Sequence, residues 1–201
     1  QNGTSPYLNY WEGGRGAPHS LYVALRDCNI FLENLVSVPG LEEDERQRWL
    51  AEVKVLKAFY HFWLLRMYGP IPTIKTNIYV GASAEEAQVP RESVDDVVEY
   101  IVELLDEVIE SDALPGIINY IYTEQGRITL PIAKALKAKV LVLAASPIFN
   151  GNTDFSELID SNGNQLVNQT YDPNKWILAR DALLDAISTA ESNGHMLYQF
   201  T

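Results

Sequence analysis

Apolar and polar residues follow a helical period along most of the chain, and the pattern is strongest in residues 45–72. Apolar side chains recur there at alternating intervals of four and three residues, at Trp49, Val53, Leu56, Tyr60, Trp63 and Met67. Between residues 58 and 68 only His61 and Arg66 interrupt the apolar run. A helix that is apolar nearly all round must be covered by other helices. The pattern therefore predicts that this helix, which Gly69-Pro70 ends, is the centre of a helical core.

Four further helices are predicted by the same period and by their end signals. They cover about residues 20–36, 93–111, 129–146 and 174–192. Ser93 is a typical N-cap, and Pro131 suits a first helical turn. The helix at 93–111 is expected to bury Val94, Val97, Val98, Ile101, Leu104, Leu105 and Val108. The last helix is expected to bury Trp176, Ala179, Leu183, Ala186 and Ile187. Between the helices, a short strand is possible at 117–122, and Asn162-Gly163 indicates a small β-hairpin.

A short motif, Lys-x-Leu-Lys-Ala, occurs in two of these helices. It starts at Lys54 in the central helix and at Lys134 in the fourth one, and each copy follows an amphipathic helix. The chain therefore reads as one helical hairpin, a second hairpin and one helix without a partner, with long insertions between them. Stacked hairpins bury their faces only against each other. The predicted fold class is all-α.

Composition narrows the functional classes. The chain has 201 residues, an apolar fraction of 47% and a formal charge of −12, with no basic run, so a nucleic-acid partner is not expected. The single cysteine, Cys28, excludes an internal disulfide and any site with several cysteine ligands. The chain opens on Gln1 with no leader or lipidated cysteine. Either a leader was removed or the sequence is an excised piece.

Chemically reactive residues show no catalytic or metal-binding arrangement. His19, His61 and His195 lack metal-ligand spacing, and the calcium-like Asp160-x-Asn162-x-Asn164 run fails the EF-hand pattern further on. No cofactor, metal or catalytic residue is predicted. His61 and Asn29 are interpreted as hydrogen-bonded core residues, and Cys28 as an inert apolar side chain. Arg66 is expected to pair within the core, because an unpaired buried charge is costly.

Four segments, in this order, resemble the SusD/RagB-like outer-membrane nutrient-binding proteins of Bacteroidetes. The central helix carries the family's signature, and the others resemble its Cys-Asn helix, its Pro-Arg-x-Ser helix start and its Gly-Arg helix that ends in Ser-Pro. The matching residues are Glu52, Leu56-Lys57-Ala58, Phe59, Tyr60, Phe62, Tyr68-Gly69 and Pro72; Cys28-Asn29; Pro90, Arg91 and Ser93; and Gly126, Arg127, Ser146 and Pro147.

The resemblance implies tetratricopeptide-like hairpins in an α-α superhelix, and a protein that is not an enzyme. It further implies a surface lipoprotein of the outer membrane that captures oligosaccharides or other nutrients and passes them to a SusC-like TonB-dependent transporter. Residues 1–201 would form one helical domain, a fragment that lacks the lipidated N-terminus and the large C-terminal part. Contact with the membrane would be made only through that absent lipid anchor.

The aromatic loop at residues 7–15 has two interpretations. Its rings either anchor the loop on neighbouring helices or present flat faces to a ligand. By resemblance, the family's ligand surface draws partly on the segment before the Cys-Asn helix, where this loop lies. We expect Trp11 and Tyr10 to stack on sugar, with Asn9 and Arg15 as polar contacts. The alternative function is a helical-repeat scaffold for protein interactions that binds no glycan.

Overall fold

The computed structural model describes residues 9–13 and 20–198, and these contain helices and no strands. The helices are α1 (Leu21–Leu35), α2 (Glu43–Tyr68), α3 (Val94–Glu110), α4 (Ile121–Glu124), α5 (Leu130–Ala145) and α6 (Asn174–Ser192), with one 3₁₀ turn at Thr153–Phe155. The all-α fold class is confirmed, and the five long helices lie close to their predicted bounds. No helix in these residues is long and apolar enough to cross a bilayer.

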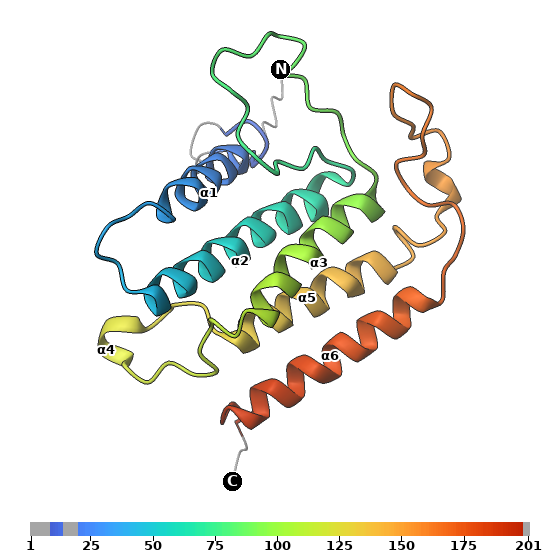
Figure 1. Cartoon of the computed structure of the whole chain (residues 1–201). Helices are drawn as coiled ribbons and strands as arrows, with labels where there is room; N and C mark the ends of the chain where they lie inside the picture. The colour runs from blue at the N-terminus through green and yellow to red at the C-terminus, as the bar shows by residue number, and fades with distance from the viewer. Residues whose placement is uncertain (1–8, 14–19, 199–201) are drawn as a thin grey trace, which may run out of the picture.

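The five long helices lie side by side, each packed against the next along the chain (Figure 1). The packed pairs are α1 with α2, α2 with α3, α3 with α5, and α5 with α6, whereas α2 touches α5 only lightly. Neighbouring helices run in opposite directions, so α1–α2 and α3–α5 are hairpins and α6 follows as a single helix. This arrangement confirms the predicted stack of helical hairpins.

Helix α2 buries a different face from the predicted one. Its buried apolar residues are Ala51, Val55, Ala58, Phe62, Leu64 and Leu65. The predicted positions from Trp49 to Trp63 are only half-buried, and Met67 is exposed. The two alanines let neighbouring helices approach closely, so the larger rings lie at the margins of the contact. Because α2 is apolar nearly all round, periodicity predicted the helix correctly but not its rotation.

The buried face of α3 is confirmed, and that of α6 is confirmed only in part. All seven predicted α3 positions are buried, and the Ser93 hydroxyl caps the helix by accepting from the Asp96 N–H at 3.1 Å. On α6, only the two alanines, Ala179 and Ala186, are buried. The other predicted positions, Trp176, Leu183 and Ile187, are 41–52% exposed. Helix α6 therefore packs on α5 through small residues and leaves its larger apolar side chains on the surface.

Buried polar residues tie the segment after α2 to the helices. Asn29 Nδ2 donates to the Ile74 carbonyl and to Asn77 Oδ1, at 3.4 and 3.3 Å. His61 Nε2 accepts from the Ile74 N–H at 3.1 Å, so Nδ1 carries the proton and donates to the Lys57 carbonyl at 2.8 Å. Burial lowers the pKa of His61 to about 4. The predictions that His61 and Asn29 are hydrogen-bonded core residues are confirmed.

The connection between α2 and α3, residues 69–93, is closed at its neck. The Glu92 N–H donates to the Ile71 carbonyl at 3.0 Å, and the Thr73 hydroxyl donates to the Glu92 carboxylate. Ile71 and Thr73 are buried at this neck, whereas Tyr79 and Val80 at the far end are more than 80% exposed. The neck is therefore part of the core, and the far end is open to solvent.

Cys28 is buried, as expected, and burial raises the pKa of its thiol to about 11.

Three other local predictions need correction. Arg66 lies on the exposed side of α2 over the Trp63 ring, 5.1 Å from its centroid, so its charge needs no core partner. The possible strand at 117–122 is wrong, since α4 begins there. The small hairpin is reduced to one antiparallel bridge between Ile159 and Gln165, because Asp160 accepts the backbone N–H groups of the turn.

Candidate functional site

The described part of the predicted loop, residues 9–13, forms a turn that the Asn9 side chain holds together. Asn9 Oδ1 accepts from the backbone N–H groups of Trp11 and Glu12, both at 3.1 Å, and the Asn9 carbonyl accepts from Gly13 at 2.9 Å. Gly13 has φ of +75°, which favours glycine. The Asn9 amide group reaches Glu12 Oε2 at 3.4 Å. The Asn9 side chain therefore sets the shape of residues 9–13.

Trp11 is wedged between the two helices of the first hairpin. Its ring makes edge-on contacts with Tyr22 of α1 and Tyr68 of α2, at centroid distances of 5.1 and 5.3 Å. The Arg91 guanidinium lies 5.2 Å from the Trp11 centroid. These neighbours occupy much of the indole surface. The contacts fit the interpretation of Trp11 as a loop anchor, and stacking of Trp11 on sugar stays a prediction.

Tyr10 is fixed through its backbone and is half-buried. Its N–H donates to Tyr68 Oη at 3.1 Å, and its carbonyl accepts from the Leu21 N–H at 2.9 Å. The structure thus brings Asn9, Tyr10 and Trp11 together at one end of the first hairpin. Arg15, the fourth predicted site residue, lies outside the described residues.

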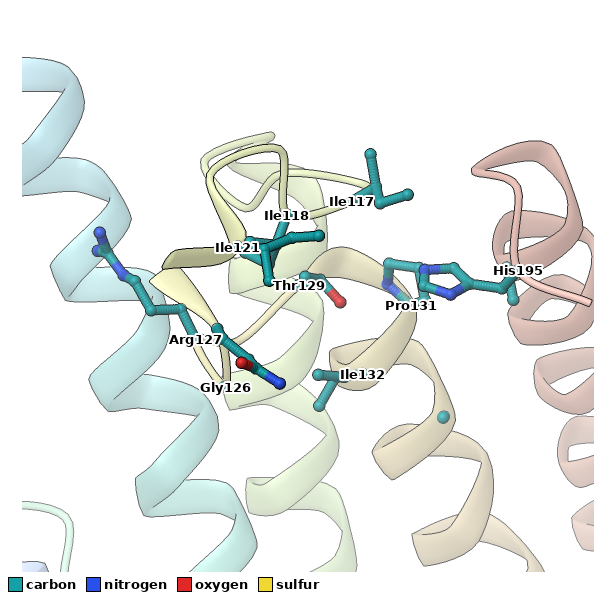
Figure 2. Close-up of a pocket in the computed structure, with 12 residues that line it drawn as sticks. Ile117, Ile118, Ile121, Gly126, Arg127, Thr129, Pro131, Ile132 and His195 are labelled. Carbon is teal, nitrogen blue, oxygen red and sulfur yellow. The ribbon is translucent and has the colours of Figure 1, made fainter. Parts of the chain in front are cut away.

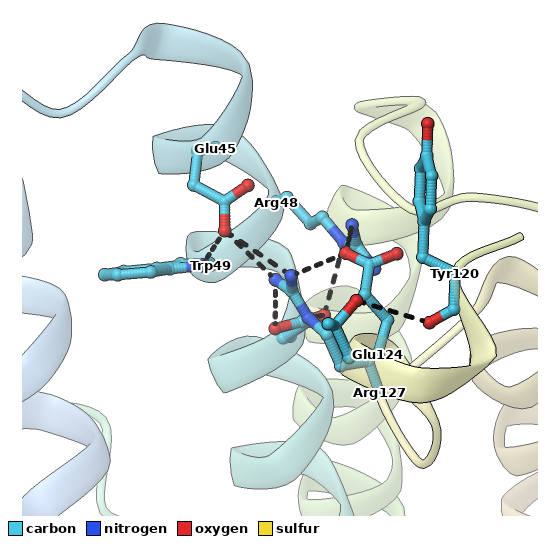
Figure 3. Close-up of polar contacts among 8 residues, drawn as sticks. Glu45, Arg48, Trp49, Tyr120, Glu124 and Arg127 are labelled. Carbon is cyan, nitrogen blue, oxygen red and sulfur yellow. Dashed lines mark hydrogen bonds and ion pairs between the residues drawn. The ribbon is translucent and has the colours of Figure 1, made fainter. Parts of the chain in front are cut away.

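An ion-pair network fills the opposite end of that hairpin and joins α2 to the segment before α5 (Figure 3). Arg127 donates to both oxygens of Glu52, at 2.9 and 3.1 Å, and to Glu124 at 3.1 Å. Arg48 donates to the same Glu124 oxygen at 2.7 Å. The hydrogen bonds to Glu52 raise the pKa of Arg127. The signature acid and the signature arginine of the sequence are therefore direct partners.

A small cleft lies beside this network. It has a volume of about 360 Å³ and is lined by Phe31, Glu45, Trp49, Glu52, Val53 and Arg127. Sequence reasoning missed it because Trp49 was assigned to the buried face of α2. The spacing of Glu45, Trp49 and Glu52, four and then three residues, is the signal that could have placed them on one helix face.

A larger hollow lies between the α4 segment, the start of α5 and the end of α6 (Figure 2). It has a volume of about 610 Å³, and its walls include Ile117, Ile118, Ile121, Thr129, Ile132 and His195. Most of the lining surface is apolar and four of the twelve lining residues are isoleucines, so Gln125, Arg127, Thr129 and His195 are its main sources of hydrogen bonds to sugar hydroxyls. Among the described residues, no three His, Cys, Asp or Glu side chains gather where they could hold a metal ion.

Comparison with known proteins identifies similar helical proteins. A SusD-like family model, described as starch-binding and associating with the outer membrane, matches residues 4–141. The solved structure of BT4246 is 34% identical with a TM-score of 0.77, and the match covers 87% of this chain and 30% of that chain. A SusD-like protein (BF3747) from Bacteroides fragilis has the same fold, at 22% identity and a TM-score of 0.65 over 94% of this chain and 27% of that one.

A laminarin-binding SusD-like protein is 29% identical, with a TM-score of 0.56 over 68% of this chain and 26% of that one. No curated protein matches the chain significantly. The chain therefore spans no more than about 30% of the length of the solved structures described above.

Proposed function

This chain belongs to the SusD-like family of proteins, described as starch-binding and associating with the outer membrane, and on that premise we propose that it captures glycans at the cell surface. It then hands them to a TonB-dependent transporter of the SusC type. The protein is proposed to be a surface lipoprotein and a binding protein that leaves the glycan intact.

The observation that carries this proposal is the family match over residues 4–141, which includes both the aromatic loop and the ion-paired signature residues. The similarity to a laminarin-binding SusD-like protein supports a glycan as the ligand. The charge of −12 disfavours polyanionic ligands and so favours neutral glycans.

The aromatic loop at residues 7–15 is the proposed glycan contact. Its described part, residues 9–13, is held by the Asn9 turn and by the anchored Trp11 ring, so this part is preorganised before ligand arrives. Tyr10 and the remaining open surface of Trp11 supply stacking surfaces, and Asn9 and Arg15 supply hydrogen-bonding groups.

Calorimetric titration with laminarihexaose and with maltohexaose tests glycan capture. Binding of at least one, with a Kd at or below about 1 mM, is expected. The Tyr10→Ala variant is expected to weaken that binding about tenfold, and Tyr171→Ala, which changes an exposed tyrosine far along the chain, serves as the control. Absence of binding to both oligosaccharides would overturn the proposal and favour the protein-interaction scaffold.

Chromatography of the same mixtures tests the second part of the proposal. The oligosaccharides are expected to be recovered uncleaved after prolonged incubation, and the appearance of shorter products would contradict a pure binding role. Delivery is tested by copurification from outer-membrane extracts, where a TonB-dependent transporter is expected with the tagged protein.

A further inference from the structure

The cleft at the end of the first hairpin combines aromatic walls with charged groups. Phe31 of α1 and Trp49 of α2 lie with ring centroids 6.3 Å apart and planes inclined by 44°, and Phe31 is 37% exposed. Glu45, Glu52 and Arg127 complete the lining. We propose that this cleft is a second carbohydrate subsite that holds one neutral sugar residue. The choice of a sugar as ligand rests on the proposed function.

The aromatic walls suit the apolar side of a sugar ring. A pyranose presents C–H groups on one face and hydroxyls around its edge, so it needs an aromatic surface with polar groups beside it. The two inclined rings lie next to each other with centroids 6.3 Å apart, so a sugar laid across their open edges, rather than between them, can touch both. The volume of about 360 Å³ is near the lower limit of about 300 Å³ for small-molecule sites, which fits one sugar unit.

Glu45 offers a free hydrogen-bond acceptor at the rim of the cleft. Its hydrogen bonds with the described residues all use Oε1, which accepts from the Trp49 indole N–H and from Arg127. Oε2 is therefore available to accept from a sugar hydroxyl. The Glu45 side chain is 39% exposed, so the acceptor is reachable, and the indole contact holds the carboxylate in place.

The charge of the network selects against acidic sugars. Three carboxylates, Glu45, Glu52 and Glu124, face two guanidinium groups, Arg48 and Arg127, so three negative charges against two positive ones leave a net charge of −1. A uronate would add a second excess negative charge in a partly buried site, which is unfavourable. A neutral hexose meets no such penalty.

The cleft lies apart from the aromatic loop. Trp49 is near the start of α2, whereas the loop contacts Tyr68 at its end, so the two sites are separated by about 28 Å along the helix at about 1.5 Å per residue. A glycan chain long enough to reach both would bind more tightly than a short one, through effective concentration.

Proton–nitrogen correlation spectra of the whole chain test the subsite directly. The four tryptophans give four indole N–H signals, and the Trp49 signal is assigned by the Trp49→Phe variant. Titration with methyl β-glucoside, and separately with laminarihexaose, is expected to move the Trp49 signal to saturation. The signal of Trp176, exposed on α6, is the internal control and is expected to stay in place. Methyl β-glucuronide at the same concentration is expected to leave the Trp49 signal unmoved.

Two matched variants separate the cleft from general surface effects. Phe31→Ala removes one wall and is expected to weaken binding at Trp49 about tenfold. Phe59→Ala removes a similarly exposed ring of α2 outside the cleft and is expected to change nothing. Denaturation midpoints of both variants establish that each is folded. If a variant does not fold, the indole titration of the unmutated chain still tests the subsite.

The possible outcomes distinguish the subsite from the proposed function. If laminarihexaose moves the Trp11 signal and leaves the Trp49 signal in place, the subsite is overturned while glycan capture stands. If the Trp49 signal moves and the Trp11 signal does not, the subsite is supported and the aromatic loop is not the glycan contact. If neither signal responds to either sugar, both ideas are wrong, and an equal response to the glucuronide overturns the selectivity for neutral sugars.

Discussion

His61 shows how a single buried residue ties the stability of the fold to pH. Burial holds its folded pKa near 4, below the ordinary value of 6.5. Between these values the unfolded chain binds more protons than the folded one, so the free energy of unfolding rises with pH. The contribution of His61 is fully present above about pH 6.5 and is lost as the pH falls to about 4. The full effect is about 3 kcal/mol, because one pKa unit corresponds to about 1.4 kcal/mol.

The His61→Gln variant tests this contribution. Urea unfolding is measured from pH 7 down to pH 4 for both proteins. The variant is expected to be less stable at pH 7 and to lose less stability over the range, because glutamine does not titrate. Parallel curves for the two proteins would show that other groups cause the pH dependence.

At the same scale, the sequence correctly identified His61 and Asn29 as hydrogen-bonded core residues, because both lie within helices with a strongly apolar pattern. It failed for Arg66, which follows the same apolar run but points toward solvent. Arg66 lies five residues after His61, about 140° further round the helix at 3.6 residues per turn. The apolar pattern of α2, which continues nearly all round, does not show which of these two directions faces the core. The cleft beside Trp49 was missed for the same reason.

At the scale of elements, Arg127 fastens α2 to the segment that leads into α5. Its side chain is 24% exposed and that of Glu52 is 17% exposed, so this contact is better shielded than most surface pairs. Arg127→Ala leaves Glu52 without its bidentate partner and is expected to lower the free energy of unfolding by about 2 kcal/mol. Chemical denaturation measures this loss.

Two comparisons sharpen that experiment. Arg127→Lys is expected to recover only part of the stability, because an ammonium group does not donate to both carboxylate oxygens in the same fork geometry. Arg180→Ala removes an exposed pair with Asp181 and is expected to cost less than about 0.5 kcal/mol. Equal losses for Arg127→Ala and Arg180→Ala would show that the network adds nothing beyond surface charge.

Helix ends and connections were predicted to different degrees. Ser93 and the Gly69-Pro70 pair marked helix ends correctly because capping and chain reversal depend on local residues. The 117–122 segment was read as a possible strand, whereas tertiary contacts with α2 fold it into α4. The contact between Arg48 and Glu124 joins residues far apart in the chain, so it could not be predicted from the local sequence.

At the scale of the whole molecule, the two Lys-x-Leu-Lys-Ala copies play matching roles. Lys54 of α2 pairs with Glu107 of α3 at 2.7 Å, and Lys134 of α5 pairs with Asp185 of α6 at 2.9 Å. Each first lysine therefore links its helix to the next one in the stack. The repeat could be predicted from the sequence, because each copy meets the same structural demand.

A stacked array predicts a gradient of local stability. Helix α6 has one packed neighbour among the described residues, whereas α2 and α3 each lie between two. Backbone amides of α6 are therefore expected to exchange with solvent deuterium at least about tenfold faster than those of α3, which corresponds to about 1.4 kcal/mol. Hydrogen-exchange mass spectrometry measures the difference, and equal protection would contradict the nearest-neighbour arrangement.

The closed neck between Ile71 and Glu92 has a consequence for how the surface can diversify. Since the helices are joined at the neck, chain added or removed around Tyr79 changes only loop-closure entropy, about 0.6 kcal/mol for each doubling of length. That tip can accept an epitope tag or an inserted module while the helical stack keeps its melting temperature. It offers natural selection a place to vary surface features without redesigning the scaffold.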